Sequence, residues 1–268
     1  MFKVSWEVPR HPELQQYLKP TEFCEPDHPE IQKFTAEVIK GDKTPKEAAM
    51  KIYLFVRDEI KLHFEGDNPW GGQLSIEVLR SKLGECYDKS NLQVAMLRAA
   101  KIPARYRFET WLPQLPSVFI PEALWEPVYE VYEMVSENPV SDLVPILFTH
   151  GLAEAYLDDK WIGCDAWLDK PLQPSAFMFN WDGEHDLSGI LPWRTAITGT
   201  SSSCPVKEWS EAAKLVPQDM LNAFYDAVNE GMNAIRAMPD DKKYRLYLEV
   251  YGKAIVKKYE IEAQKWKK

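Results

Sequence analysis

The chain has 268 residues, 45% of them hydrophobic, which is enough to bury one large core or one core with an appended subdomain. Its net charge of -9 and pI near 5.2 exclude a broad basic surface, so we expect no nucleic-acid partner. No apolar run approaches the roughly 18 residues of a membrane span, and the first residues lack the apolar stretch of a signal peptide, so we expect a cytoplasmic protein without membrane association.

The cysteines do not indicate a metal centre or a disulfide framework. They are far apart in the sequence, form no Cys-x-x-Cys pair and have no histidine at ligand spacing: Cys24, Cys86, Cys164 and Cys204. We expect no metal and no cofactor. Cys24 and Cys164 are interpreted as small buried hydrophobes.

The first half of the chain is predicted to be helical. Residues 29–63 contain two helices, and the second begins at TPKE, where Thr44 caps, Pro45 fits the first turn and Glu47 completes a capping box. After a loop rich in Gly, Asn and Pro, the stretch SIEVLRSK predicts a short helix that stops at Gly84.

A helix over residues 86–100 follows, because apolar residues recur there at three- and four-residue spacing and Pro103 blocks its continuation. ARYRFETWL is expected to be a strand, and GLAEAYLDDKWIGCDAW two strands that turn at Asp158 and Asp159. Residues 113–148, rich in proline and aromatic residues, indicate an insertion that can act as a lid. Beyond Pro205 the spacing of apolar residues predicts two further helices.

Cys86 is a candidate nucleophile because it begins a helix. The positive end of the helix dipole is expected to lower the pKa of its thiol and so to raise the fraction of thiolate. The backbone N–H groups at the same helix end can hold the oxygen that becomes negative when a carbonyl is attacked.

His150 and Asp165 are candidates for the base and its orienting carboxylate. With a two-residue turn at Asp158 and Asp159, Leu157 faces Lys160, and Asp165 lies diagonal to His150 on one face of the sheet. This separation allows a hydrogen bond between imidazole and carboxylate, whereas a shift of one residue would separate them.

GECYDKSNLQVAMLRAAKIPARYRF followed by HGLAEAYLDDKWIGCD closely resembles the core of the transglutaminase-like superfamily, whose members are related to papain-like cysteine peptidases. The resemblance extends over residues 17 to about 190, and this part of the chain looks like the bacterial members of the superfamily. It rests on Gly84, Cys86, Arg98, Ile102 to Arg105, His150, Glu154, Trp161 and Asp165.

The resemblance implies an α+β fold in which the cysteine-bearing helix packs on an antiparallel sheet, with Cys86 as nucleophile, His150 as general base and acid, and Asp165 as orienting carboxylate. We divide the chain into a catalytic domain, 1–204, and a C-terminal helical extension on the same domain, 205–268. Two positions depart from the family pattern, which often has Gly at Lys101 and Trp at Leu152.

Other residues are weaker candidates. A side-chain oxyanion donor is expected upstream of Cys86, where Gln73 is preferred to Trp70 and His63. Trp70, Tyr87 and Leu152 are candidate pocket residues. Glu154 is interpreted as a cross-strand partner or surface charge, and the loop with Asp182, His185 and Asp186 as turn chemistry rather than a cation site.

The predicted activity is acyl transfer, most simply hydrolysis of an amide bond in a small-molecule or short peptide-like substrate through a thioester. Three alternatives stay open. The same residues can act on an ester or a C–C bond beside a carbonyl, or transfer the acyl group to an amine as a transglutaminase does. The chain can also be a non-catalytic binding protein with this fold.

Overall fold

The computed structural model of the chain describes residues 2–65, 72–111, 149–188, 194–204 and 217–265. This part combines helices with an antiparallel sheet, as the sequence predicted. The predicted insertion, 113–148, lies outside the described residues, and the division at residue 204 stays a prediction. None of the described helices is both long and apolar enough to cross a membrane.

The N-terminal helices form where the capping signals predicted them. A short 3-10 helix, η1 (Pro12–Leu18), precedes α1 (Pro29–Val38) and α2 (Pro45–Glu59). At the start of α2 the hydroxyl of Thr44 accepts from the backbone N–H of Glu47 at 3.2 Å, and the carboxylate of Glu47 accepts from the N–H of Thr44 at 3.1 Å. The predicted capping box is therefore confirmed.

Between α2 and the next long helix the chain forms a small parallel pair, β1 (Lys61–Leu62) with β2 (Leu83–Gly84), around α3 (Ser75–Ser81). The prediction that this helix stops at Gly84 is wrong, because Lys82 already takes a left-handed conformation, with φ of 60°. Gly84 is needed for close approach instead: an added Cβ would lie 2.7 Å from the Cβ of Asp88.

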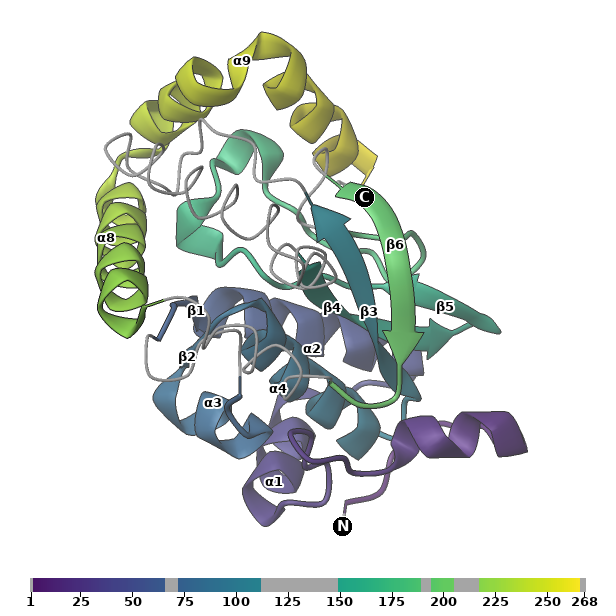
Figure 1. The fold of residues 1–268 in the computed structure, drawn as a ribbon. Coiled ribbons are helices and arrows are strands. Elements are labelled where there is room, and N and C mark those ends of the chain that lie inside the picture. Colours follow the sequence, from purple (N-terminus) through teal and green to yellow (C-terminus); the bar gives the residue numbers. More distant parts are fainter. Residues whose placement is uncertain (1, 66–71, 112–148, 189–193, 205–216, 266–268) are drawn as a thin grey trace.

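Helix α4 (Cys86–Ala99) is the central element of the core, and every one of its residues after Cys86 is buried. It packs on β3 (Ala104–Trp111) and β4 (Thr149–Leu157), as Figure 1 shows. The chain leaves the helix through Lys101, at φ 62°, and the N–H of Ile102 donates to the carbonyl of Leu97 at 3.0 Å. This left-handed position explains why similar sequences often have glycine there.

The sheet has four strands in the order β5-β4-β3-β6, with β5 at Lys160–Gly163 and β6 at Arg194–Ser201. The predicted register of the β4–β5 hairpin is confirmed, because Leu157 pairs with Lys160. Asp158 and Asp159 have positive φ, 48° and 61°, as a two-residue turn between twisted strands requires. Strand β6 was not predicted; it lies in a Thr- and Ser-rich stretch and pairs with β3 across register shifts.

The two C-terminal helices, α8 (Gln218–Ala237) and α9 (Asp240–Lys265), are where the sequence predicted helices, although Gly252 interrupts α9 with φ of 75°. In Figure 1 α8 lies alongside β1. The side-chain amide of Asn229 accepts from the N–H of Phe64 at 3.0 Å and donates to its carbonyl at 2.8 Å. Arg236 pairs with Asp169 at 2.6 Å, so α8 is attached to the core at two points.

Helix α9 is attached through two 3-10 turns, η4 (Lys170–Leu172) and η5 (Ser175–Phe177). The backbone N–H and the hydroxyl of Ser175 both donate to Asp240, at 2.8 and 3.0 Å. The hydroxyl of Tyr247 donates to the carbonyl of Leu172 at 3.2 Å. Both C-terminal helices therefore contact the part of the chain that the sequence assigned to the catalytic domain.

Arg98, near the end of α4, connects three distant segments. Its fully buried guanidinium donates to the carbonyls of Ala104 at 2.9 Å, Lys19 at 2.6 Å and Ser202 at 2.6 Å. A buried cation is tolerated only where such partners replace water. These bonds join the N-terminal region, the start of β3 and the residues after β6 to α4.

Arg98→Ala is expected to lower the free energy of unfolding by about 3 kcal/mol or more, because it leaves buried carbonyl groups without their donor. Urea denaturation measures this change. Arg80→Ala, which removes an exposed pair with Glu30, is the matched control and should have a much smaller effect. Equal effects of the two substitutions would contradict this role of Arg98.

Candidate active site

Cys86 is the first residue of α4 and is partly buried. The preceding residue, Glu85, has extended backbone and caps the helix: its carboxylate accepts from the N–H of Tyr87 at 3.3 Å. Asp88 completes the cap by accepting from the N–H of Glu85 at 3.2 Å. The cap keeps the thiol at the helix end, where the sequence predicted it.

His150 and Asp165 are brought together by the hairpin, as predicted. Nε2 of His150 and Oδ2 of Asp165 are 2.7 Å apart, and both residues are buried. The other oxygen of Asp165 accepts from the N–H of Trp167 at 3.0 Å, and the Trp167 ring packs edge-on to the imidazole, with centroids 5.3 Å apart. These contacts orient both side chains and leave Nδ1 of His150 on the side of the ring away from Asp165.

Ser90 and Tyr87 join the start of α4 to the strand that carries His150. The hydroxyl of Ser90 donates to the carbonyl of Cys86, at 2.7 Å, and lies 3.0 Å from the carbonyl of Gly151. The ring of Tyr87 lies so close to Gly151 that an added Cβ would be 2.1 Å from it. Glycine is therefore required beside His150 for α4 to approach β4.

The thiol of Cys86 donates to the carboxylate of Glu85, with Sγ 3.5 Å from Oε2. No hydrogen bond joins Cys86 to His150 in the described part of the chain, although the N–H of Gly151, next to His150, points at the sulfur and lowers the pKa of the thiol. The thiol of Cys86 is therefore hydrogen-bonded to Glu85 and not to His150.

The predicted lowering of the Cys86 pKa is wrong for this arrangement. Burial raises the pKa of the thiol well above its usual value, and the charges of Glu85 and Asp165 raise it further. Burial and repulsion by Asp88 also raise the pKa of Glu85, to about 8. The helix dipole favours a thiolate, but low solvent access and neighbouring carboxylates outweigh it.

Three of the four weaker candidates lie in the described part of the chain. Gln73 is buried against the first turn of α4, where its backbone N–H donates to Asp88 at 3.1 Å and its side-chain amide to the same carboxylate at 3.4 Å. Trp70 lies outside the described residues. Tyr87 and Leu152 are both buried, at 2% and 0% exposure. The roles predicted for these four residues stay predictions.

Lys89, one helical turn beyond Cys86, was not identified from the sequence as a buried cation. It is 1% exposed and its ammonium donates to the carbonyl of Ile60 at 2.7 Å. Burial lowers its pKa to about 8, although Asp169 and Asp165 act in the opposite direction. Its charge therefore lies near the carboxylate that orients His150.

Tyr225 of α8 is a second residue that the sequence did not indicate. Its ring stacks on Phe64, with centroids 5.3 Å apart and planes 21° apart. Burial raises the pKa of its phenol well above the usual value, and the charges of Glu85 and Cys86 contribute. The C-terminal helices thus reach the surroundings of Cys86, which apolar spacing along α8 cannot predict.

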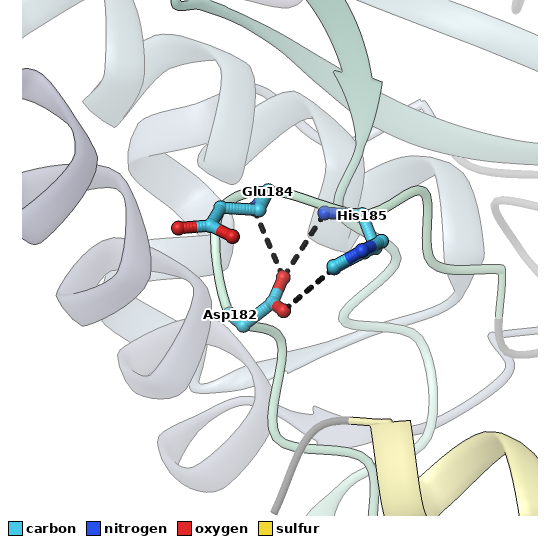
Figure 2. Close-up of side chains that lie close together, drawn as sticks. All are labelled: Asp182, Glu184 and His185. Carbon is cyan, nitrogen blue, oxygen red and sulfur yellow. Dashed lines mark hydrogen bonds and ion pairs between the residues drawn. The ribbon is translucent and has the colours of Figure 1, made fainter. Parts of the chain in front are cut away.

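One group of potential metal ligands occurs in the described residues: Asp182, Glu184 and His185, shown in Figure 2. Asp182 accepts from the backbone N–H groups of Glu184 and His185, at 2.9 and 3.0 Å, and from the His185 ring at 2.8 Å. Glu184 pairs with Lys46. The turn chemistry predicted for this loop accounts for the group.

Glu85→Gln should make Cys86 more reactive, because it removes the carboxylate that opposes the thiolate and keeps an oxygen for the helix cap. The pH dependence of iodoacetamide alkylation at Cys86, followed by mass spectrometry, should move to lower pH by roughly one unit. Glu77→Gln, at the exposed start of α3, is the control. An unmoved curve, or an equal shift in the control, would contradict the role of Glu85.

Part of the chain matches a known protein family. Residues 32–166, half of the chain, match the model of the transglutaminase-like superfamily. A solved structure named a "Putative Cysteine Protease", from Cytophaga hutchinsonii, is 20% identical, with a TM-score of 0.41, over 60% of this chain and 44% of that one, so the chain spans less than half of its length. No curated protein matches. The chain belongs to the transglutaminase-like superfamily.

Proposed function

We propose that the chain is a cysteine hydrolase that cleaves an amide bond with Cys86 as nucleophile, His150 as general base and acid, and Asp165 as orienting carboxylate. The family supports a cysteine-dependent hydrolase or acyltransferase in general terms. The observation that carries the proposal is the buried contact of 2.7 Å between His150 and Asp165, on a strand whose next residue, Gly151, lies against the first turn of α4.

The first step is attack on the substrate carbonyl. Because Asp165 engages Nε2, Nδ1 of His150 takes the proton from the Cys86 thiol while sulfur bonds to the carbonyl carbon. In the resting protein the pKa of the thiol is raised, so proton transfer accompanies attack rather than preceding it. Asp165 stabilises the imidazolium that results.

The tetrahedral intermediate carries a negative oxygen, which the backbone N–H groups at the start of α4 stabilise. One of these, the N–H of Tyr87, donates to Glu85 in the resting structure, so the Glu85 side chain has to release it. His150 then protonates the leaving nitrogen and the C–N bond breaks, which leaves a thioester on Cys86. Water, deprotonated by His150, releases the acid and restores the thiol.

Water is proposed as the acceptor because no described residue marks a site for an amine. The proposed substrate is a small or compact molecule or a short peptide-like one. A cytoplasmic location of the protein also stays a prediction. Cleavage of an ester or of a C–C bond beside a carbonyl would use the same three residues. The alternative that is not an enzyme is a binding protein with this fold. In that case Cys86 should not become acylated.

Acylation of Cys86 by p-nitrophenyl acetate tests the proposal without knowledge of the substrate. A burst of p-nitrophenol and an acetyl group on Cys86, detected by mass spectrometry, are expected in the parent chain. Cys86→Ala should abolish the burst. His150→Ala and Asp165→Asn should lower its rate by about 10²–10⁴-fold, because the base is lost or misoriented.

The chain supplies a matched control for the histidine and aspartate. Asp182 and His185 form a similar but more exposed pair, with Oδ2 and Nδ1 2.8 Å apart (Figure 2). Asp182→Asn and His185→Ala should leave the burst unchanged, as should Cys204→Ala. Acylation that persists in Cys86→Ala, or that falls equally in the Asp182 and Asp165 variants, would reject the proposed catalytic residues.

A further inference from the structure

One face of the sheet around His150 carries a row of buried charges. The register of β3 and β4 sets three residues of β3 opposite three of β4: Arg105 with Glu154, Arg107 with Leu152, and Glu109 with His150. Since side chains alternate along a strand, all six lie on the same face. Glu154 is 4% exposed, and Arg105 and Arg107 pair with it at 2.5 and 3.2 Å. It is thus a cross-strand partner, one of its predicted roles, and not a surface charge.

Glu109 is the member of this row that lies directly opposite His150. It is completely buried, at 0% exposure. One oxygen forms an ion pair with the guanidinium of Arg107 at 2.8 Å, and the other accepts a hydrogen bond from the hydroxyl of Ser188 at 2.6 Å. Directly opposite side chains on neighbouring strands have Cβ atoms about 5 Å apart. The register therefore places a carboxylate residue of β3 directly opposite His150, whereas Asp165 follows β5 on the other side of β4.

Arg107 and Glu109 form an ion pair whose positive end is held by further contacts of Arg107. It is 3% exposed and also pairs with Asp186 at 2.5 Å. Burial lowers the pKa of Arg107, but the carboxylates of Asp186, Glu109 and Glu154 raise it overall, so it keeps its positive charge. Arg107 lies two residues before Glu109 on β3, opposite Leu152, so the negative end of the Arg107–Glu109 pair faces the histidine.

The charges of this region favour a cation at His150. Two guanidinium groups, of Arg105 and Arg107, face the carboxylates of Glu109, Glu154 and Asp186, and Asp165 adds a fourth carboxylate. The other titratable groups near the His150–Asp165 pair include Tyr53 of α2, three residues of α4 and one residue after β5: Glu85, Cys86, Lys89 and Cys164. Of these, only Lys89 opposes a cation.

We propose that Glu109 is a positioning residue of the active site, whose carboxylate stabilises the imidazolium form of His150 from the neighbouring strand. The inference rests on the proposed function, in which the Cys86 proton passes to His150 during attack. His150 is 3% exposed, so water solvates the imidazolium poorly. Asp165 compensates from one side, and the Arg107–Glu109 pair, already oriented, compensates from the other.

Glu109→Gln tests this role because it removes the charge and keeps the size of the side chain. The titration of the His150 C2–H proton, followed by NMR and assigned with His150→Gln, is expected to move to lower pH by about one unit, since the imidazolium loses a neighbouring anion. The acid limb of the pH profile for acylation by p-nitrophenyl acetate should move in the same direction. The rate at its plateau should fall about tenfold, because the histidine becomes a weaker base.

Glu154→Gln is the matched control. It also removes a buried carboxylate from the same face of the sheet. Glu154, however, lies four residues further along β4 than His150. Its effect on the His150 titration should be clearly smaller. If Glu109→Gln does not fold, Glu109→Asp, which keeps the charge but draws it back from the histidine, should give a smaller shift of the same sign.

A folded Glu109→Gln chain whose His150 titration and acid limb do not move would overturn the inference, as would an equal shift in Glu154→Gln. These outcomes differ from failure of the proposed function. If His150→Ala leaves acylation of Cys86 intact, the catalytic assignment of His150 fails whatever Glu109 does. The NMR titration needs no substrate, so it reports on Glu109 in either case.

Discussion

The candidate site depends on the antiparallel register of β4 and β5. A two-residue turn with two left-handed aspartates sets Leu157 opposite Lys160, and this pairing brings Asp165 to the His150 ring. Because side chains alternate along a strand, a shift by one residue would carry Asp165 to the other face of the sheet. The same strand holds Gly151, whose lack of a side chain admits Tyr87 and so allows α4 to approach His150.

Around this site, burial has more influence than the helix dipole. Cys86 begins α4, yet its thiol is partly buried and lies next to a carboxylate, and its pKa is raised. On β3, Glu109 lies opposite His150, the residue at which a positive charge would form. Carboxylates near Cys86 oppose a thiolate. In the proposed mechanism, those near His150 would stabilise the imidazolium that forms when the Cys86 proton moves from sulfur to nitrogen.

Helix α8 connects to the site through the backbone of β1 and of the residues just after it. Asn229 satisfies both the N–H and the carbonyl of Phe64, and Arg236 joins Asp169 to the carbonyl of Leu62. Strand β1 pairs with β2, which leads directly into Cys86. Helix α8 therefore supports the segment from which the nucleophile projects, and it brings Tyr225 into the surroundings of that segment.

Local signals in the sequence are enough to predict three features: the capping box of α2, the helix that begins at Cys86 and the hairpin register that joins His150 to Asp165. These follow from periodicity, caps and turn residues, which act within a few positions. The fold was needed to establish the direction in which the pKa values of Cys86 and Glu85 shift. It was also needed to find the partners of four residues: Arg98, Lys89, Glu109 and Tyr225. Burial and contacts between segments far apart in the chain set those properties, and no local pattern records which carboxylate will lie beside which thiol or imidazole.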